Sequence, residues 1–356
     1  LKYPKSGKKM NKIFNKEVNK NSIDKARDWV QILAKYRTPN LYRSIFELII
    51  TFIPFILIWA LAWYCLSYSV WITLILSAFN SLFILRLFVI QHDCGHSSFF
   101  KSRAVSDWVG RFIGVLTITP YDVWRRTHSE HHSGAGNLGR QGMGDINTKT
   151  VSEYQTLSQF QKFIYRLYRN PFVLFAIIPT YLFMLQNRLP LGLMNSGSKY
   201  WLSAMGTNLS IAIVLSTIYY FGGWAPVCLI FLPSTLLAAT FGVWLFYVQH
   251  QFEDTHWDHE EEWDMHEAAL EGSSHYDLPL VLHWFSANIG IHHIHHLYSR
   301  IPFYRLPQIV KDYPVLSENQ RLSIYESFAC VKLHLWDEND RKLISYKQFH
   351  RKYGKV

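Results

Sequence analysis

The chain has 356 residues with a net charge of +10, of which 17% are charged and 16% are aromatic, and its mean hydropathy is zero. The averages hide two blocks without Asp, Glu, Lys or Arg, which cover the 38 residues 48–85 and the 53 residues 200–252. A bilayer core about 30 Å thick requires about 20 apolar residues per helix, so each block is long enough for two crossings. This pattern excludes a soluble globular protein and predicts an all-α, polytopic membrane protein.

The positive charge is concentrated at the start of the chain, where residues 1–44 hold 12 Lys or Arg against three acids. A basic segment before a first membrane helix follows the positive-inside rule, so we expect residues 1–44 to be a cytosolic N-terminal segment. Nucleic-acid binding is the competing explanation of a basic run. The run contains no recognisable nucleic-acid-binding module, and we therefore expect no nucleic-acid partner.

Each charge-free block predicts a helical hairpin. The first hairpin is expected at about 48–64 and 69–90, and the second at about 204–220 and 227–248. Two further apolar stretches, 112–121 and 172–185, are short, and we expect re-entrant or interfacial segments there. Four crossings place both termini and all remaining charged segments in the cytosol. We thus expect a membrane domain at 45–310 with a cytosolic helical cap, followed by a cytosolic tail at 311–356.

Histidine is clustered in three groups of five residues, namely HDCGH at 92–96, HSEHH at 128–132 and HHIHH at 292–296. These pentads hold nine of the chain's 17 histidines. Residues three or four apart share a helix face, and neutral imidazole is a common metal ligand. Scattered core histidines or a buffering surface patch would not cluster in this way. Nine histidines exceed what one ion can use, so the pattern predicts two metals.

The positions of the histidines agree with a single site. His92 follows directly on the second predicted membrane helix, and His250 follows the fourth in the same way. If each charge-free block makes an even number of crossings, all three pentads lie on one side of the membrane. The sequence therefore predicts a dimetal site in the cytosolic cap.

Two other functions compete for these features. A zinc protease requires Glu as general base in its two-histidine helix motif, but Asp93 stands at that position and seven clustered histidines would be idle. A metal transporter requires ionisable groups near the bilayer midplane, and the predicted hairpins hold almost none. Arg86 is the exception. It lies near a helix end, where it either extends to the headgroup region or binds a headgroup phosphate.

The pentads and their context resemble the integral-membrane fatty acid desaturases, in particular the bacterial acyl-lipid branch. The resemblance rests on the three boxes in family order and on stretches such as FVIQHDCGHSSFF, YDVWRRTHSEHH and FYVQHQFEDTHW, and it covers about residues 45–310. It implies an O2-dependent oxidoreductase with two Fe2+ ions. Carried over by position, the metal ligands are His92, His96, His128, His131, His132, His250, His292, His295 and His296.

Five other residues are considered for the site. Asn288 could join through a water molecule, and His293 and His283 are expected next to the ligands without contacting metal. His256 and His275 stand where relatives are expected to have an aromatic residue, so we leave them out. The acyl chain is expected in an apolar tunnel, with walls from the cytosolic halves of the four helices and from re-entrant stretches such as 112–121.

The resemblance also implies partners. The sequence contains no haem-binding domain and no flavin or dinucleotide fingerprint, so we expect electrons from ferredoxin or another external donor. The expected substrates are acyl chains of phospholipids in a bacterial cytoplasmic membrane. A lipid or carotenoid hydroxylase or ketolase of the same superfamily is the alternative. The sequence does not determine which carbon is attacked or whether the acyl chain is carried on a lipid or a thioester. It also leaves the oligomeric state open.

Overall fold

The computed structural model describes residues 18–142 and 145–354. It contains four helices that are long and apolar enough to cross a membrane, which confirms the two predicted hairpins. The first hairpin is α3 (Leu41–Cys65) and α4 (Val70–Gly95). The second pairs α10 (Ser198–Gly222) with a continuous helix, Trp224–His250, that comprises α11 (Trp224–Pro226), the π-helical η4 (Val227–Phe231) and α12 (Leu232–His250).

Local residue chemistry explains where these helices begin and end. The side chains of Asn40 and Ser69 accept hydrogen bonds from backbone N–H groups in the first turns of α3 and α4, as N-cap residues do. Helix α10 ends at Gly222, and Gly223 follows with φ of 65°, a left-handed conformation that glycine adopts without steric cost. The uncharged links therefore form tight turns.

Helix α4 is the inner helix of the four. It packs against α3, against α12 and against α5 (Arg103–Leu116), and 56% of its apolar window is buried, compared with 11% for α10. The side chains of Leu202, Leu209 and Ile213 on α10 are exposed. An exposed apolar face of this length suits contact with lipid chains.

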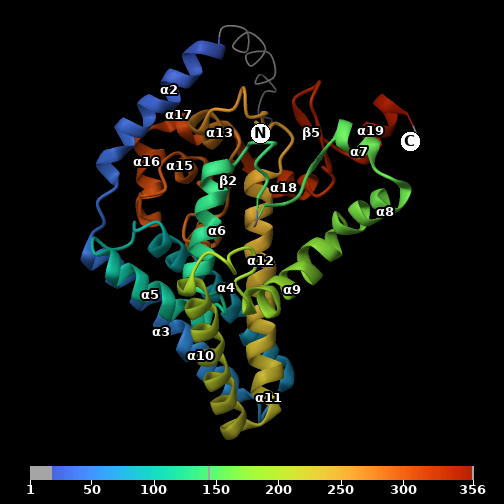
Figure 1. The fold of residues 1–356 in the computed structure, drawn as a ribbon. Coiled ribbons are helices and arrows are strands. Elements are labelled where there is room, and N and C mark those ends of the chain that lie inside the picture. Colours follow the sequence, from blue (N-terminus) through green and yellow to red (C-terminus); the bar gives the residue numbers. More distant parts are fainter. Residues whose placement is uncertain (1–17, 143–144, 355–356) are drawn as a thin grey trace, which may run out of the picture.

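The rest of the chain forms a cap at the ends of the helices that carry His92 and His250 (Figure 1). The fold is mostly helical, as predicted, but the cap also contains short strands that the sequence did not predict. Its elements before α10 are α2 (Val18–Leu33), η1 (Ala34–Tyr36), α5, α6 (Tyr121–Gly134), β1 (Lys149–Thr150), α7 (Val151–Thr156), α8 (Gln159–Tyr168), the π-helical η2 (Val173–Ile177), α9 (Ile178–Met184) and η3 (Gln186–Arg188).

After α12 the chain returns to the cap and stays there, so α2 and α19 lie at the same end of the molecule (Figure 1). These later elements are α13 (Met265–Glu271), β2 (His275–Asp277), α14 (Leu280–Phe285), α15 (His292–Leu297), η5 (Phe303–Arg305), α16 (Leu306–Asp312), α17 (Pro314–Ser317), β3 (Arg321–Ser323), α18 (Ile324–Cys330), β4 (Leu335–Asp337), β5 (Lys342–Ile344) and α19 (Tyr346–Tyr353).

Strand pairing joins the C-terminal tail to the cap. Strand β4 pairs with β1 in parallel and with β5 in antiparallel orientation, and β3 pairs in parallel with β2. Because β2 precedes the third histidine pentad closely in the chain, residues beyond 310 pack beside the segment that carries it. Tyr276 and Ser327 add a hydrogen bond between hydroxyl groups, 3.0 Å apart, to this contact.

The two short apolar stretches take different forms. Residues 112–121 comprise the last residues of α5, the link 117–120 and the first residue of α6, whereas most of residues 172–185 form η2 and α9. Helix α8 and the segment Val173–Arg188 are long and apolar enough to cross a membrane only when they are taken together, and the pair is bent by 59° at the break between them. A bend of this size is typical of a broken span or a re-entrant loop, and the re-entrant interpretation stays a prediction.

Candidate metal centre

Four helices bring the predicted histidines together. The C-terminal end of α4 supplies His92 and, directly after it, His96; α12 ends at His250. Helices α6 and α15 lie between these ends and supply the remaining six. The ring nitrogens form two sets, each with all its ligand atoms within 4.8 Å of one another: His92, His96, His128, His132 and His295 in the first, and His131, His250, His292 and His296 in the second.

The spacing of the ring nitrogens fits shared metal ions. In the five-histidine set, the Nε2 atoms of His128 and His96 are 3.0 Å apart, and those of His295 and His132 are 3.2 Å apart. In the four-histidine set, His250 Nε2 lies 3.2 Å from His131 Nε2. Nitrogens that bind one ion at about 2.1 Å are about 3.0–3.4 Å apart, depending on the coordination angle. Each set therefore has the dimensions of a metal site.

Burial favours the neutral, metal-binding form of these side chains. It lowers the pKa of each of the cap histidines His96, His128, His132, His292, His295 and His296 well below the usual value. Both ring nitrogens of His92 and of His296 are buried and have no hydrogen-bond partner among the described residues. Buried polar atoms normally have partners, so these orphaned nitrogens also fit a set of metal ligands.

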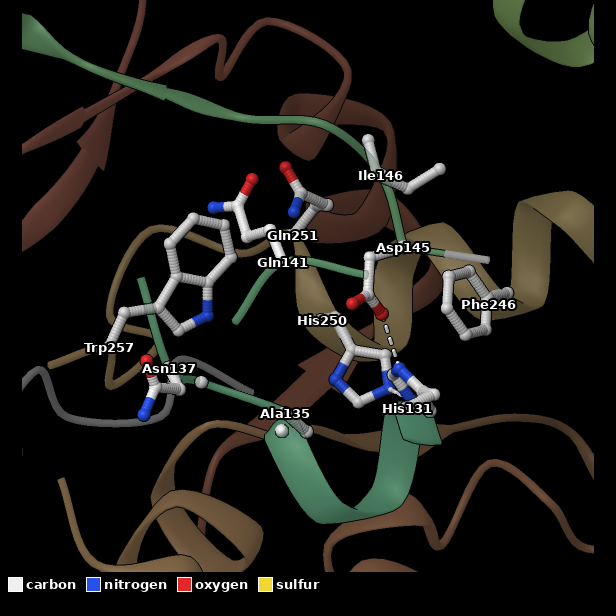
Figure 2. Close-up of a pocket in the computed structure, with 12 residues that line it drawn as sticks. His131, Ala135, Asn137, Gln141, Asp145, Ile146, Phe246, His250, Gln251 and Trp257 are labelled. Atoms are coloured by element: carbon white, nitrogen blue, oxygen red, sulfur yellow. Dashed lines mark hydrogen bonds and ion pairs between the residues drawn. The ribbon is translucent and has the colours of Figure 1, made fainter. Parts of the chain in front are cut away.

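Two ligand candidates donate hydrogen bonds from the ring nitrogen that faces away from the centre. His131 Nδ1 is 2.5 Å from Asp145 Oδ1, and His250 Nδ1 is 3.4 Å from the carbonyl oxygen of Gly272. Figure 2 shows the first contact at the edge of a small pocket of about 40 Å³. Asp145 was missed in the sequence because a single Asp in a loop gives no spacing signal.

Three predicted neighbours of the centre lie outside both sets. His293 Nε2 hydrogen-bonds to the carbonyl oxygen of Leu316, and His283 Nε2 accepts from the N–H of Leu278. The side-chain amide of Asn288 donates to the carbonyl oxygen of Phe303, at 3.4 Å. The side chains of His293 and His283 thus hold loops of the cap, and whether Asn288 acts through water stays a prediction.

Both excluded histidines are engaged elsewhere. His256 forms an ion pair with Asp258, with 2.7 Å between Nε2 and Oδ2, and His275 hydrogen-bonds to the carbonyl oxygen of Ser317. Burial lowers the pKa of His256, but the hydrogen bond to Asp258 and the negative charges of Asp258 and Glu267 together raise it more, so the net shift is upward. A histidine that favours the protonated form is a poor metal ligand.

Arg86 is buried, with 1% of its surface exposed, and makes internal contacts. It pairs with Glu47, donates to Thr51 and to the carbonyl oxygen of Trp284, and stacks on the Trp284 ring. All three guanidinium nitrogens are thereby engaged within the protein, which does not favour the headgroup contact considered from the sequence. The sequence missed Glu47 because it stands immediately outside the first charge-free block.

A cavity of about 590 Å³ meets the histidines, and most of its lining is apolar. His92, His128, His131 and His292 line it where it reaches the centre. Its walls come from α4, α6, α9 and α12 and from residues 117–120, while α3 and α10 contribute none of its lining residues. Residues of α4, α12 and the 112–121 stretch, where tunnel walls were expected, thus line this cavity. Residues of α3 and α10 line a second apolar cavity of about 610 Å³, which shares Ile84 and Thr235 with the first, so the part of these two helices in a tunnel stays a prediction.

Fold and site together define an integral membrane protein with two buried histidine sets, each able to hold a metal ion, beside an apolar cavity. Residues 69–327 match a sequence model of the family described as Fatty acid desaturase. A relative named Fatty acid desaturase from Bacillus subtilis (strain 168) is 38% identical over 323 residues, which is 91% of each chain. The chain therefore belongs to the fatty acid desaturase family, whose members are oxidoreductases.

More distant relatives carry names that specify substrates. An sn-1 acyl-lipid omega-3 desaturase (ferredoxin) from Nostoc sp. (strain 36) is 29% identical over 274 residues, covering 72% of this chain and 73% of the relative. An sn-1 oleoyl-lipid 12-desaturase from Synechocystis sp. is 29% identical over 250 residues, covering 69% of this chain and 67% of the relative.

Proposed function

We propose that this member of the family is a membrane-bound acyl-lipid desaturase, which introduces a cis double bond into a saturated or monounsaturated acyl chain. The observation that carries the proposal is the contact between the histidine centre and the apolar cavity. A concave, mostly apolar site of this size suits a flexible hydrocarbon chain. The relatives named as acyl-lipid and oleoyl-lipid desaturases support the same substrate class.

We assign two iron ions to the centre, one to each histidine set. When bound, the ions would supply the oxidising power that dioxygen chemistry needs at an unactivated methylene group. The overall reaction takes up O2, two electrons and two protons, removes two hydrogens from the chain and releases two water molecules. The proposed ligands are His92, His96, His128, His132 and His295 for one ion, and His131, His250, His292 and His296 for the other.

The protein's own task is to hold the chain and to keep water away from it. Ala238, Ala239 and Gly242 leave space along one face of α12, so a chain can lie against that helix. On another wall the Trp124 ring stacks on His128, with 4.6 Å between ring centres. This stacking fixes the orientation of a proposed ligand and covers it with an apolar surface.

Electrons must come from outside the chain, and we propose a soluble ferredoxin as the donor. The relative from Nostoc, whose name includes ferredoxin, supports this choice. We also propose that the protein lies in a bacterial cytoplasmic membrane with both termini and the cap in the cytoplasm. The basic N-terminal segment supports this orientation, because positively charged flanks stay on the cytoplasmic side.

Expression in a host whose membrane lipids are saturated tests the proposed reaction. We expect double bonds to appear in lipid acyl chains when oxygen and ferredoxin are supplied, and mass spectrometry of derivatised lipids locates them. A variant that lacks His250 provides the inactive control. Hydroxylated or ketolated products without a new double bond would instead support the alternative reaction of the same superfamily.

The proposed orientation predicts which sites an impermeant thiol reagent reaches in intact cells. Cysteines that replace Ser67 and Phe221, which are exposed in or beside the two hairpin links, should be labelled from outside. Cysteines that replace Gln155 and Val315, which are exposed in the cap, should be labelled only after the cells are opened. Labelling of the cap positions in intact cells would contradict the orientation.

The labelling needs a background with few reactive thiols. Cys65 is partly exposed and Cys228 is exposed, so both should first be replaced by Ala. Cys94 and Cys330 are buried and can remain. The background protein should then give no signal before unfolding, which provides the blank for each labelled position.

A further inference from the structure

The two histidine sets differ in what supports them from behind. In the described part of the chain, His131 is the member of the nine whose ring hydrogen-bonds to a carboxylate, with 2.5 Å between Nδ1 and Asp145 Oδ1. His92 Nδ1 lies 3.4 Å from Asp93 Oδ1, but both atoms remain without a hydrogen bond. Among the described residues, hydrogen-bonded support by a carboxylate therefore belongs to the four-histidine set.

The Asp145 carboxylate is itself held in place. Its second oxygen, Oδ2, accepts a hydrogen bond of 2.9 Å from the N–H of Gly142, and 17% of the side chain is exposed. Asp145 lines both cavities that touch the centre, the small pocket of Figure 2 and the apolar cavity, and of the described residues it is the one acid in either lining. Its position is thus fixed between the polar pocket and the proposed substrate site.

A carboxylate in this position acts on a metal through the imidazole between them. When the Nδ1–H group of His131 donates a hydrogen bond to Asp145, the free lone pair of the neutral ring is on Nε2. This Nε2 atom lies 3.2 Å from His250 Nε2. Such a contact fixes the tautomer and ring orientation and raises the basicity of the ligand. The four-histidine set has one ligand fewer than the other, so stronger donation from His131 compensates there.

We propose that Asp145 is a positioning residue for His131 and selectively strengthens metal binding by the four-histidine set. This inference rests on the metal centre of the proposed function. It makes the two metal positions unequal. Removal of the Asp145 carboxylate should weaken metal binding by the four-histidine set and leave the ion of the five-histidine set in place.

The test compares Asp145→Ala, Asp145→Asn and the unmodified full chain, each purified and loaded with zinc. We measure zinc per chain and the rate of zinc transfer to a colorimetric chelator, without substrate or electron donor. Loss of an outer carboxylate typically costs 10–100-fold in metal affinity. We therefore expect one of two zinc ions to leave about 10–100-fold faster from Asp145→Ala. Asp145→Asn keeps the size and one acceptor oxygen and should be intermediate.

Glu130→Ala is the matched control. Glu130 is the residue before His131, but its carboxylate pairs with Arg126 at the surface, with 2.9 Å between Nε and Oε1. Like Asp145→Ala, this variant removes one acidic side chain, in this case from α6. It should release zinc at the rate of the unmodified chain. A similar acceleration in Glu130→Ala would show a general charge effect and overturn the assignment to Asp145.

Two other results would overturn the proposal. One is unchanged zinc content and release from Asp145→Ala, and the other is equal acceleration for both ions in a folded variant. If Asp145→Ala does not fold, Asp145→Asn decides alone: faster loss of one ion supports the proposal and unchanged rates reject it. Absence of zinc from the unmodified chain would instead contradict the metal centre of the proposed function, so the two failures are distinguishable.

Discussion

Replacement of His250 by Ala is expected to abolish desaturation and to lower the metal content of the purified protein. His250 Nε2 lies 3.2 Å from His131 Nε2 and 3.0 Å from His292 Nε2, so the side chain joins ligands from two other helices. Its loss leaves three histidines in a set of four. We expect activity to fall by more than the 10–100-fold typical of outer residues around a metal. Lipid analysis and elemental analysis measure the two effects.

His293→Ala is the matched control for this prediction. His293 is also a buried histidine of a pentad, but its Nε2 hydrogen-bonds to the carbonyl oxygen of Leu316 and it belongs to neither set. Its variant should lose some stability and keep both metals. An active His250→Ala protein with two metals per chain, or loss of one metal from His293→Ala, would show that the ligand assignment is wrong.

The second large effect is expected for Arg86→Ala, in the free energy of unfolding. The Arg86 side chain is 2% exposed and pairs with Glu47, which is equally buried. Removal of one partner of a buried ion pair typically costs about 3–5 kcal/mol, because it leaves the other charge uncompensated. Arg43 also contacts Glu47, with 2.6 Å between Nη2 and Oε1, so we expect the lower half of this range. Thermal unfolding in detergent measures the loss.

A second variant separates this explanation from a loss of packing. If unpaired Glu47 causes the destabilisation, Glu47→Gln in the Arg86→Ala background should restore part of the stability. Arg126→Ala removes an exposed pair with Glu130 instead and should change stability by less than about 0.5 kcal/mol. Equal loss in Arg86→Ala and Arg126→Ala would contradict a structural role for the buried pair.

The membrane helices could be predicted from the sequence because charge is excluded from a bilayer core. Their limits were less accurate: α3 begins at Leu41 and not near Leu48, since Arg43 and Glu47 lie within it. A count of charges does not reveal that two opposite charges one helical turn apart form a pair. The short strands of the cap were missed because two or three residues carry no alternating pattern.

The spacing of the histidines predicted their convergence but not their division into sets. Pairs four residues apart stay together, as His92 with His96, His128 with His132, and His292 with His296. His131 and His295 then join opposite sets, which depends on how α6 and α15 pack against each other. That packing is a tertiary property, and no local period in the sequence encodes it.

This division has a consequence for how the protein matures. Helices α6 and α15 each contribute to both sets, so each ion would link these two helices to each other and to one membrane helix. That helix is α4 for the five-histidine set and α12 for the four-histidine set. These metal links close loops of up to about 200 residues, and closing such loops in an unfolded chain has a high entropic cost. We therefore expect metal loading to be a late folding step: the hairpins can insert into the bilayer on hydrophobicity alone, and the cap would become fixed to them when the metal ions bind.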